Sequence, residues 1–136
     1  MNNPGLCSLG DFSITSAGTQ TGEWVDDLDG MLAACAQLRF AYGSGGTAIK
    51  AYLQTSLDGG TTVVDIACVV FGTASEVAAL NLSALTPKTT AIVPTDGALS
   101  DDTALDGILG DRLRLKVVST GTYAGSTVLS GRVTVR

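Results

Sequence analysis

The sequence contains no histidine. This absence excludes catalysis by Ser-His or Cys-His pairs, zinc sites built on imidazole and acid–base steps that use histidine. Charged residues make up only 15% of the chain, and 13 Asp and Glu against 8 Lys and Arg give a net charge of −5. No basic run is present, so the counterion release that drives nucleic-acid binding has little to act on. We therefore expect no enzymatic activity and no nucleic-acid partner.

Long apolar runs are missing as well. No stretch reaches the roughly 18 to 20 uninterrupted apolar residues of a membrane span, so no membrane partner is expected. The first ten residues carry no basic residue and no apolar core of a signal peptide. The expectation is therefore a chain made in a cytoplasm without a secretory signal. Nothing in the sequence predicts a cofactor.

Glycine, with 17 residues, is abundant, and 45% of the chain is hydrophobic. This composition, rich also in Thr and Ser, suits short strands and tight turns rather than long helices. A length of 136 residues suits one domain with one core. We expect an all-β fold, a jelly-roll-like antiparallel β-sandwich of about eight or nine strands over residues 11–136. Residues 1–10 show no periodicity and are predicted to form an extended N-terminal arm.

Alternating apolar and polar residues mark the strands. In residues 112–119, Leu113, Leu115 and Val117 alternate with basic residues, which predicts one core face and one solvent face. Residues 47–56 repeat the pattern. The strand candidates are residues 12–17, 22–26, 32–42, 47–56, 62–71, 77–83, 88–93, 112–119 and 127–136.

The segment DDTALDGILGD at residues 101–111 is the one candidate for a helix. Asp101 or Asp102 could cap it, and its apolar residues fall on one side. We expect one short helical turn near residues 102–109.

The three cysteines are an odd number, so pairing within the chain would leave one over. Cys68 shares a predicted strand face with apolar neighbours while Asp65 points the opposite way, which indicates a buried thiol. Cys35 falls on the outward face of its strand, and Cys7 lies in the predicted arm. Such a pair is what an inter-subunit disulfide requires, so Cys7 and Cys35 are its candidates, with two unpaired thiols as the alternative.

Other polar features leave functional alternatives open. Aspartates in turns could supply the oxygen ligands of a calcium site, although Asp is also common in turns for backbone reasons. These aspartates are Asp26, Asp27, Asp29, Asp101, Asp102, Asp106 and Asp111. Paired carboxylates could instead serve a glycosidase, although nothing marks a pair. Trp24 and Tyr52 are candidates for a sugar-binding platform or for interface contacts, with burial in the core as the competing interpretation.

Two segments resemble parts of known proteins. The first is AYLQTSLDGGTTVVDIA at residues 51–67. It predicts two strands joined by a turn in which Asp58 hydrogen-bonds the backbone while Gly59 and Gly60 supply positive φ. The second segment is ILGDRLRLKV at residues 108–117, followed by a Gly-Thr-Tyr sequence.

Both segments resemble small β-sandwich structural proteins from the virions of tailed bacteriophages and prophages. Val63 stands where that group commonly has tryptophan. The resemblance implies a non-enzymatic virion protein, most directly a capsid decoration or cement protein. Its expected partners are other copies of itself, as a homo-oligomer, and the phage capsid. The alternatives are a neck or tail component and a carbohydrate-binding sandwich for host glycans.

Overall fold

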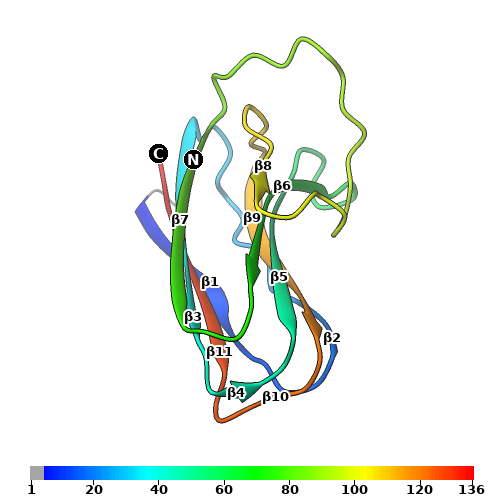
Figure 1. Ribbon diagram of the computed structural model, residues 1–136. Coiled ribbons are helices and arrows are strands. Elements are labelled where there is room, and N and C mark those ends of the chain that lie inside the picture. Colours follow the sequence, from blue (N-terminus) through cyan, green and yellow to red (C-terminus); the bar gives the residue numbers. More distant parts are fainter. Residues whose placement is uncertain (1–4) are drawn as a thin grey trace.

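The computed structural model describes residues 5–136 and contains no helix in that range. Its strands are β1 (Gly5–Ser13), β2 (Gly18–Thr21), β3 (Ala33–Ala41), β4 (Ser44–Gly45), β5 (Ala48–Ser56), β6 (Val64–Phe71), β7 (Glu76–Ser83), β8 (Thr103–Ala104), β9 (Arg112–Thr120), β10 (Tyr123–Ala124) and β11 (Val128–Val135). They form two antiparallel sheets packed as a sandwich, with strand orders β1-β11-β3-β7 and β2-β9-β5-β6-β8 (Figure 1). The short strands β4 and β10 pair separately.

The chain passes repeatedly from one sheet to the other. It runs through β1 in the four-stranded sheet, β2 in the five-stranded sheet, β3 back in the first, β5 and β6 in the second, β7 in the first, β9 in the second and β11 in the first. Two four-stranded sets joined in this order are a jelly roll, the double Greek key of eight strands. The predicted fold class is thus confirmed.

The core lies between the sheets and is built by alternation along the strands. Leu113, Leu115 and Val117 are all buried, as the sequence pattern of β9 predicts. An aromatic group completes the core near β4 and β10. There, the Phe40 ring lies 5.3 Å from that of Phe71, and Tyr123 meets Phe40 edge-on, with ring centroids 6.0 Å apart. Such offset and edge-on pairs stabilise a core beyond the area they bury.

The predicted arm is strand over residues 5–10. These residues belong to β1, which pairs with β11 from Gly5 opposite Val135 to Ser13 opposite Val128. Leu9 is 2% exposed and belongs to the core. The predicted boundary at residue 10 is therefore wrong for residues 5–10, because apolar positions spaced around a bulge hide the alternation that marks a strand. Residues 1–4 of the predicted arm lie outside the described residues.

Three strand predictions are also wrong in whole or in part. Of the predicted strand at residues 12–17, only Phe12 and Ser13 are strand, at the end of β1, and β2 begins later, at Gly18. Residues 22–26 contribute only a single bridge, between Val25 and Leu113. Residues 88–93 lie in the connection between β7 and β8 and form no strand. Pro87 and Pro94 flank that segment, and a proline disfavours a strand on either side of it because it cannot donate a hydrogen bond to a neighbouring strand.

The predicted helical turn near residues 102–109 does not form. Asp102 has a φ of 52° and Gly107 a φ of 103°, and both values lie in the left-handed region that interrupts a right-handed helix. The residues between them instead make β8, which pairs with Ala67 and Cys68 of β6. Residues 103–104 therefore pair with the edge of the sheet instead of forming the helical turn that their local sequence favours.

β6 contains a bulge that changes which side chains face the core. Tyr52 lies opposite Cys68 and Gln54 opposite Asp65, so Ile66 is an extra residue in the ladder. An extra residue reverses the facing of the residues before it. The predicted arrangement, with Cys68 on the core face and Asp65 opposite it, is therefore wrong. Both residues lie on the outer face of the five-stranded sheet.

A glycine in β11 tests how tightly the two sheets pack. A Cβ added at Gly131 would lie 2.5 Å from Cδ1 of Leu115 in the opposite sheet and 3.1 Å from Cβ of Leu9. We predict that Gly131→Ala lowers the free energy of unfolding by about 1–3 kcal/mol through overpacking, measured by urea denaturation. Gly72→Ala is the matched control, since nothing lies within 4 Å of its added Cβ. Equal stability of the two variants would contradict this account of the core.

Candidate functional site

The outer faces of the two sheets differ. Residues 84–102, here called the covering loop, join β7 to β8 and arch away from the sandwich before returning to the five-stranded sheet (Figure 1). On the outer face of that sheet, Tyr52 is 4% exposed and Gln54 is fully buried. The solvent face predicted for β5 is therefore covered by the chain itself.

Asp65 fastens the covering loop to the sheet. Its Oδ2 accepts hydrogen bonds from the backbone amides of Gly97, at 2.8 Å, and Ala98, at 2.9 Å, and from the Thr95 hydroxyl, at 2.8 Å. Its Oδ1 accepts a bond from Nε2 of Gln54, also at 2.8 Å. Successive amides that converge on one carboxylate form an anion-binding nest. The buried Asp65 carboxylate is thus fully engaged in holding the loop.

A second aspartate, Asp96, joins the loop to the side chains of the sheet. Its carboxylate accepts bonds from Nε2 of Gln54, at 2.8 Å, and from Nζ of Lys116, at 3.1 Å. Burial acts to raise the pKa of Asp96, but the hydrogen bonds from Gln54 and Lys116 and the nearby positive charges outweigh it and lower that pKa. Nearby, Nζ of Lys50 lies 2.8 Å from Oδ1 of Asp101. The loop is therefore pinned at three points along its last third.

The two aromatics considered as a sugar platform are already occupied. The Arg114 guanidinium lies over the Trp24 ring, 4.2 Å from its centroid, and Nε of Arg114 donates to Oε1 of Gln54. This stacking is a cation–π contact that uses one face of the half-buried indole. Tyr52 lies beneath the covering loop. The structure thus leaves no pair of open rings at these positions.

Asp58, Gly59 and Gly60 form the turn between β5 and β6. Oδ1 of Asp58 accepts a bond from the amide of Thr62 at 2.7 Å, and Gly59 and Gly60 have φ values of 74° and 96°. The hydroxyl of Ser56 accepts a bond from the amide of Gly60 at 2.9 Å. The bond from the Thr62 amide is the largest cause of the lowered pKa of Asp58. These residues organise a tight turn.

Several of the aspartates considered for calcium bind other groups of the chain. Asp106 accepts bonds from the amide of Ser83 and the hydroxyl of Thr86, and Asp102 accepts one from the amide of Val70. Within residues 5–136, no three Cys, Asp or Glu side chains gather as a metal-binding group. The hydrogen bonds of Asp102 and Asp106 therefore stabilise the loops in which these residues lie.

The three cysteines occupy three different environments, and all three thiols are unbonded. Cys7 is half-buried and packs against the core from β1, whereas Cys35 is exposed on the outer face of β3. Cys68 is 1% exposed, and burial raises the pKa of its thiol. A disulfide between Cys7 of one chain and Cys35 of another stays a prediction. It would require Cys7 to turn away from the core.

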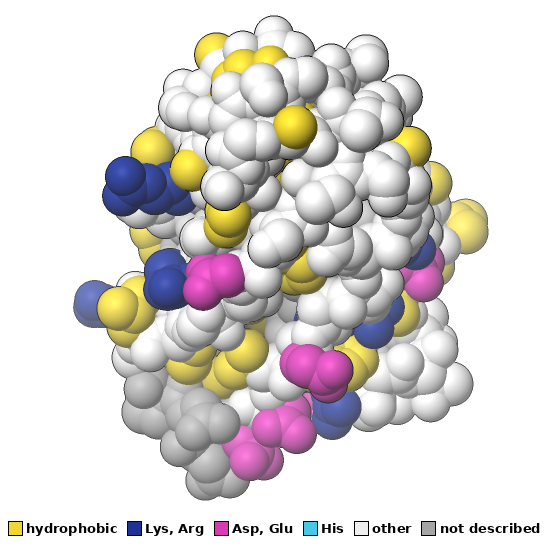
Figure 2. Space-filling view, turned by 90° about the horizontal axis from the view of Figure 1, so that it is seen from below, with side chains coloured by type: hydrophobic (Ala, Val, Ile, Leu, Met, Phe, Trp, Pro, Cys, Tyr) yellow, Lys and Arg dark blue, Asp and Glu magenta, His cyan; other side chains and the backbone are white. Residues whose placement is uncertain are grey.

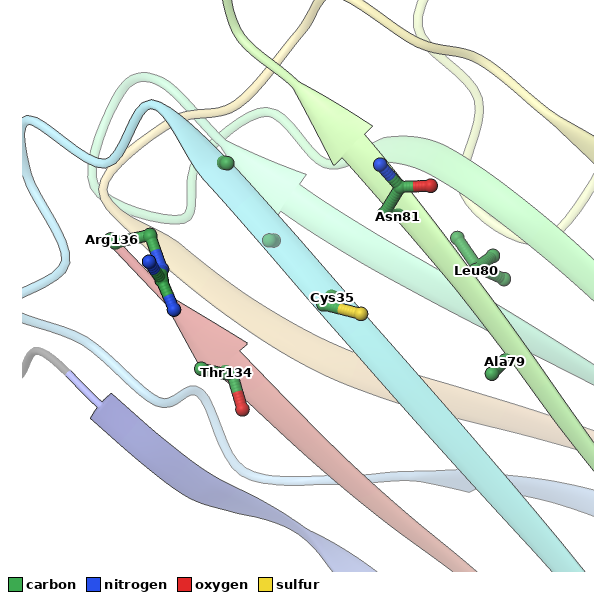
Figure 3. Close-up of a pocket in the computed structure, with 8 residues that line it drawn as sticks. Cys35, Ala79, Leu80, Asn81, Thr134 and Arg136 are labelled. Atoms are coloured by element: carbon green, nitrogen blue, oxygen red, sulfur yellow. The ribbon is translucent and has the colours of Figure 1, made fainter.

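The outer face of the four-stranded sheet holds a shallow hollow of about 400 Å³. Cys35 lies in its floor, in register with Thr134 of β11 on one side and Asn81 of β7 on the other (Figure 3). Small residues make the hollow, because Ala33 and Ala79 project little from their strands. Leu6 of β1, which lies opposite Thr134, is 73% exposed, and Val77 of β7 is 58% exposed. Within residues 5–136, no loop covers this face as the covering loop covers the other one.

Comparisons with family models, with curated proteins and with solved structures find no match for this chain. No helix within residues 5–136 is long and apolar enough to cross a membrane. Figure 2 shows charged side chains scattered over one face of the molecule rather than gathered in a single patch. The candidate site is therefore argued from the geometry of the chain alone.

Sequence reasoning found the exposed Cys35 but missed the Asp65 network. The available indication was a charged residue within the apolar run VVDIACVV. A carboxylate in such a run is buried and therefore needs several hydrogen-bond donors. The identity of those donors, which lie about thirty residues further along the chain, carries no local sequence pattern.

Removal of the Asp65 charge should loosen the covering loop. We predict that Asp65→Asn lowers the free energy of unfolding by about 2–3 kcal/mol, because an amide cannot accept all the bonds that the carboxylate accepts. Limited proteolysis should then cut within residues 84–102. Asp101→Asn is the comparison, since its ion pair with Lys50 is exposed to solvent on both sides and should hold the loop far less firmly than Asp65 does. Equal protease resistance of the two variants would show that Asp65 does not hold the loop.

The thiols should react in the order of their exposure. We predict that a maleimide modifies Cys35 first, Cys7 more slowly and Cys68 only after unfolding. The thiolate is the reactive form, and both burial and a raised pKa disfavour it at Cys68. Mass spectrometry of the native protein over time, with single Cys→Ser variants, assigns each phase. Rapid native labelling of Cys68 would contradict the covering of the five-stranded sheet.

Proposed function

We propose that this chain is a non-enzymatic structural protein of a tailed-phage virion, most directly a capsid decoration protein held by surface contacts. One observation carries the proposal: the two outer faces of the sandwich are unequal. The covering loop occupies the face of the five-stranded sheet, whereas none of the described residues 5–136 covers the face of the four-stranded sheet around Cys35, here called the bare face. Such a bare face suits attachment to a large neighbour, because adhesion needs accessible area rather than a deep cleft.

The resemblance supports the same proposal through its place in the fold. Residues 51–67 contain most of β5, the Asp58 turn and the start of β6, and residues 108–117 lead into β9. β9, β5 and β6 are neighbours in one sheet. The two similar segments therefore form one continuous structural unit. Jelly rolls also occur in viral capsid and lectin domains, which makes this a fold-level analogy.

A particle-association experiment tests the proposal. Phage particles from the strain that encodes the chain are purified on a density gradient, and the chain is measured in the particle fraction by mass spectrometry. We predict a fixed ratio of the chain to the major capsid protein, and increased heat resistance when the chain is added to particles that lack it. Its absence from particles would refute the proposal, and its presence only in isolated tails would assign it to the tail.

Variants locate the contact. Cys35→Asp places a charge in the floor of the hollow and is expected to abolish binding to particles. Val93→Asp is the matched control, because Val93 is 86% exposed in the covering loop and lies outside the hollow. Both variants should keep the circular dichroism spectrum of the native chain. Equal binding of the two would remove the bare face from the proposal.

A further inference from the structure

The edges of the two sheets are not equally protected. Unpaired edges invite pairing with other strands, and proteins block them with short strands, bulges, charges or proline. In the five-stranded sheet, β2 has four residues and β8 has two. In the four-stranded sheet, β1 carries a register shift between Ser8 and Gly10. Three of the four edges of the main sheets therefore carry a recognised form of protection.

β7 is the exception. It has eight residues, and each is in unbroken antiparallel register with β3, from Phe40 opposite Glu76 to Ala33 opposite Ser83. Its sequence, EVAALNLS, contains no proline, lysine or arginine, and its single charge is at the first position. β7 closes one side of its sheet (Figure 1). It is a long, regular edge strand with apolar composition.

Two hydrogen bonds establish which backbone groups point outward from this edge. The amide of Ala84 donates to the carbonyl of Leu32, toward β3, whereas the amide of Ser83 donates to Oδ1 of Asp106, on the other side. Alternate residues of a strand direct their amides and carbonyls to opposite sides. The backbone groups of Val77, Ala79 and Asn81 therefore point away from β3. Within residues 5–136 they have no hydrogen-bond partner.

The side chains at this edge favour contact as well. Val77 is 58% exposed, and Ala79 is exposed on the same face, beside the Cys35 hollow. Ala78 and Leu80 point to the core side of the sheet, where they pack against the core but stay half-exposed at the edge. A strand added here would bury these apolar groups and satisfy the outward amides and carbonyls together.

We propose that β7 pairs antiparallel with β7 of a second copy of this chain, so that one continuous sheet runs through both sandwiches. A two-fold dimer formed by strand pairing needs a self-complementary edge, and of the edge strands within residues 5–136 only β7 is both long and regular. With Ala79 on the two-fold axis, Val77 lies opposite Asn81 and Ala78 opposite Leu80 of the other copy. The two Glu76 carboxylates then lie at opposite ends of the paired strands, where they do not repel each other.

The hydrogen bond from Ser83 to Asp106 limits the length of this pairing. Asp106 occupies the last outward amide of β7, so the free amides and carbonyls are those of Val77, Ala79 and Asn81. These three residues are spaced evenly about Ala79. A two-fold axis at Ala79 therefore brings the outward groups of Val77 in one copy opposite those of Asn81 in the other. The inference goes beyond the proposed function, since it concerns the isolated chain and holds whether or not the chain belongs to a particle.

Light scattering coupled to size exclusion tests the dimer with the full-length chain. The native chain is expected at twice the 13.8 kDa mass of one copy, and Ala79→Pro at 13.8 kDa. Proline removes an outward amide without breaking the ladder to β3, which is where an edge strand tolerates it. Val77→Lys is expected to give the same loss, because an edge lysine opposes pairing. Val93→Lys, with the same charge in the covering loop, should remain dimeric.

Hydrogen exchange provides a second measurement. The amides of Val77, Ala79 and Asn81 should be protected in the native dimer and exchange faster in Val77→Lys, while amides of β5 stay unchanged. A native chain that remains monomeric from micromolar to millimolar concentration would overturn the proposal. A dimer that persists in folded Val77→Lys but is lost in Cys35→Asp would overturn it in favour of contact through the face of the sheet. If Ala79→Pro fails to fold, Val77→Lys decides the matter.

Discussion

The carboxylate of Asp65 holds the covering loop in place, and much of the five-stranded sheet depends on that contact. Ordering the backbone of a loop costs about 1–2 kcal/mol per residue, and residues 84–102 form no strand that would offset this cost. Asp65 supplies one acceptor group for several loop donors at once, including the successive amides of Gly97 and Ala98. Charge-assisted bonds of this kind are stronger than neutral ones. The loop in turn shields Tyr52, Gln54 and Cys68 from water.

The position of Asp65 depends on a backbone irregularity. The extra residue Ile66 in β6 brings Asp65 opposite Gln54 and onto the outer face. Without that bulge, strict alternation would turn the carboxylate toward the apolar core, away from the donors that it binds in the loop. The bulge, the carboxylate and the loop therefore form one structural unit. Each part is stable because the other two are present.

Much of the sandwich could be predicted from local sequence, because alternation is a local property. The core positions of β9 and the outward position of Cys35 follow from a period of two residues. The bulge at Ile66 could not be predicted, since an apolar residue beside another apolar residue leaves the alternation ambiguous. Residues 88–93 have strand composition but no adjacent edge, and residues 103–104 find an edge despite helical spacing. Such outcomes depend on tertiary partners that sequence periodicity does not contain.

The course of the chain after β7 explains why the bare face and the open edge lie together. At the end of β7 the loop could have folded back along its own strand and closed the edge. Instead, Asp106 binds the amide of Ser83 and Asp65 draws residues 95–99 across to the other sheet. One sheet thereby gains a second layer, while the other keeps both its outer face and the β7 edge exposed. The same hydrogen bonds that complete the five-stranded sheet thus leave the four-stranded sheet as the place where we propose association.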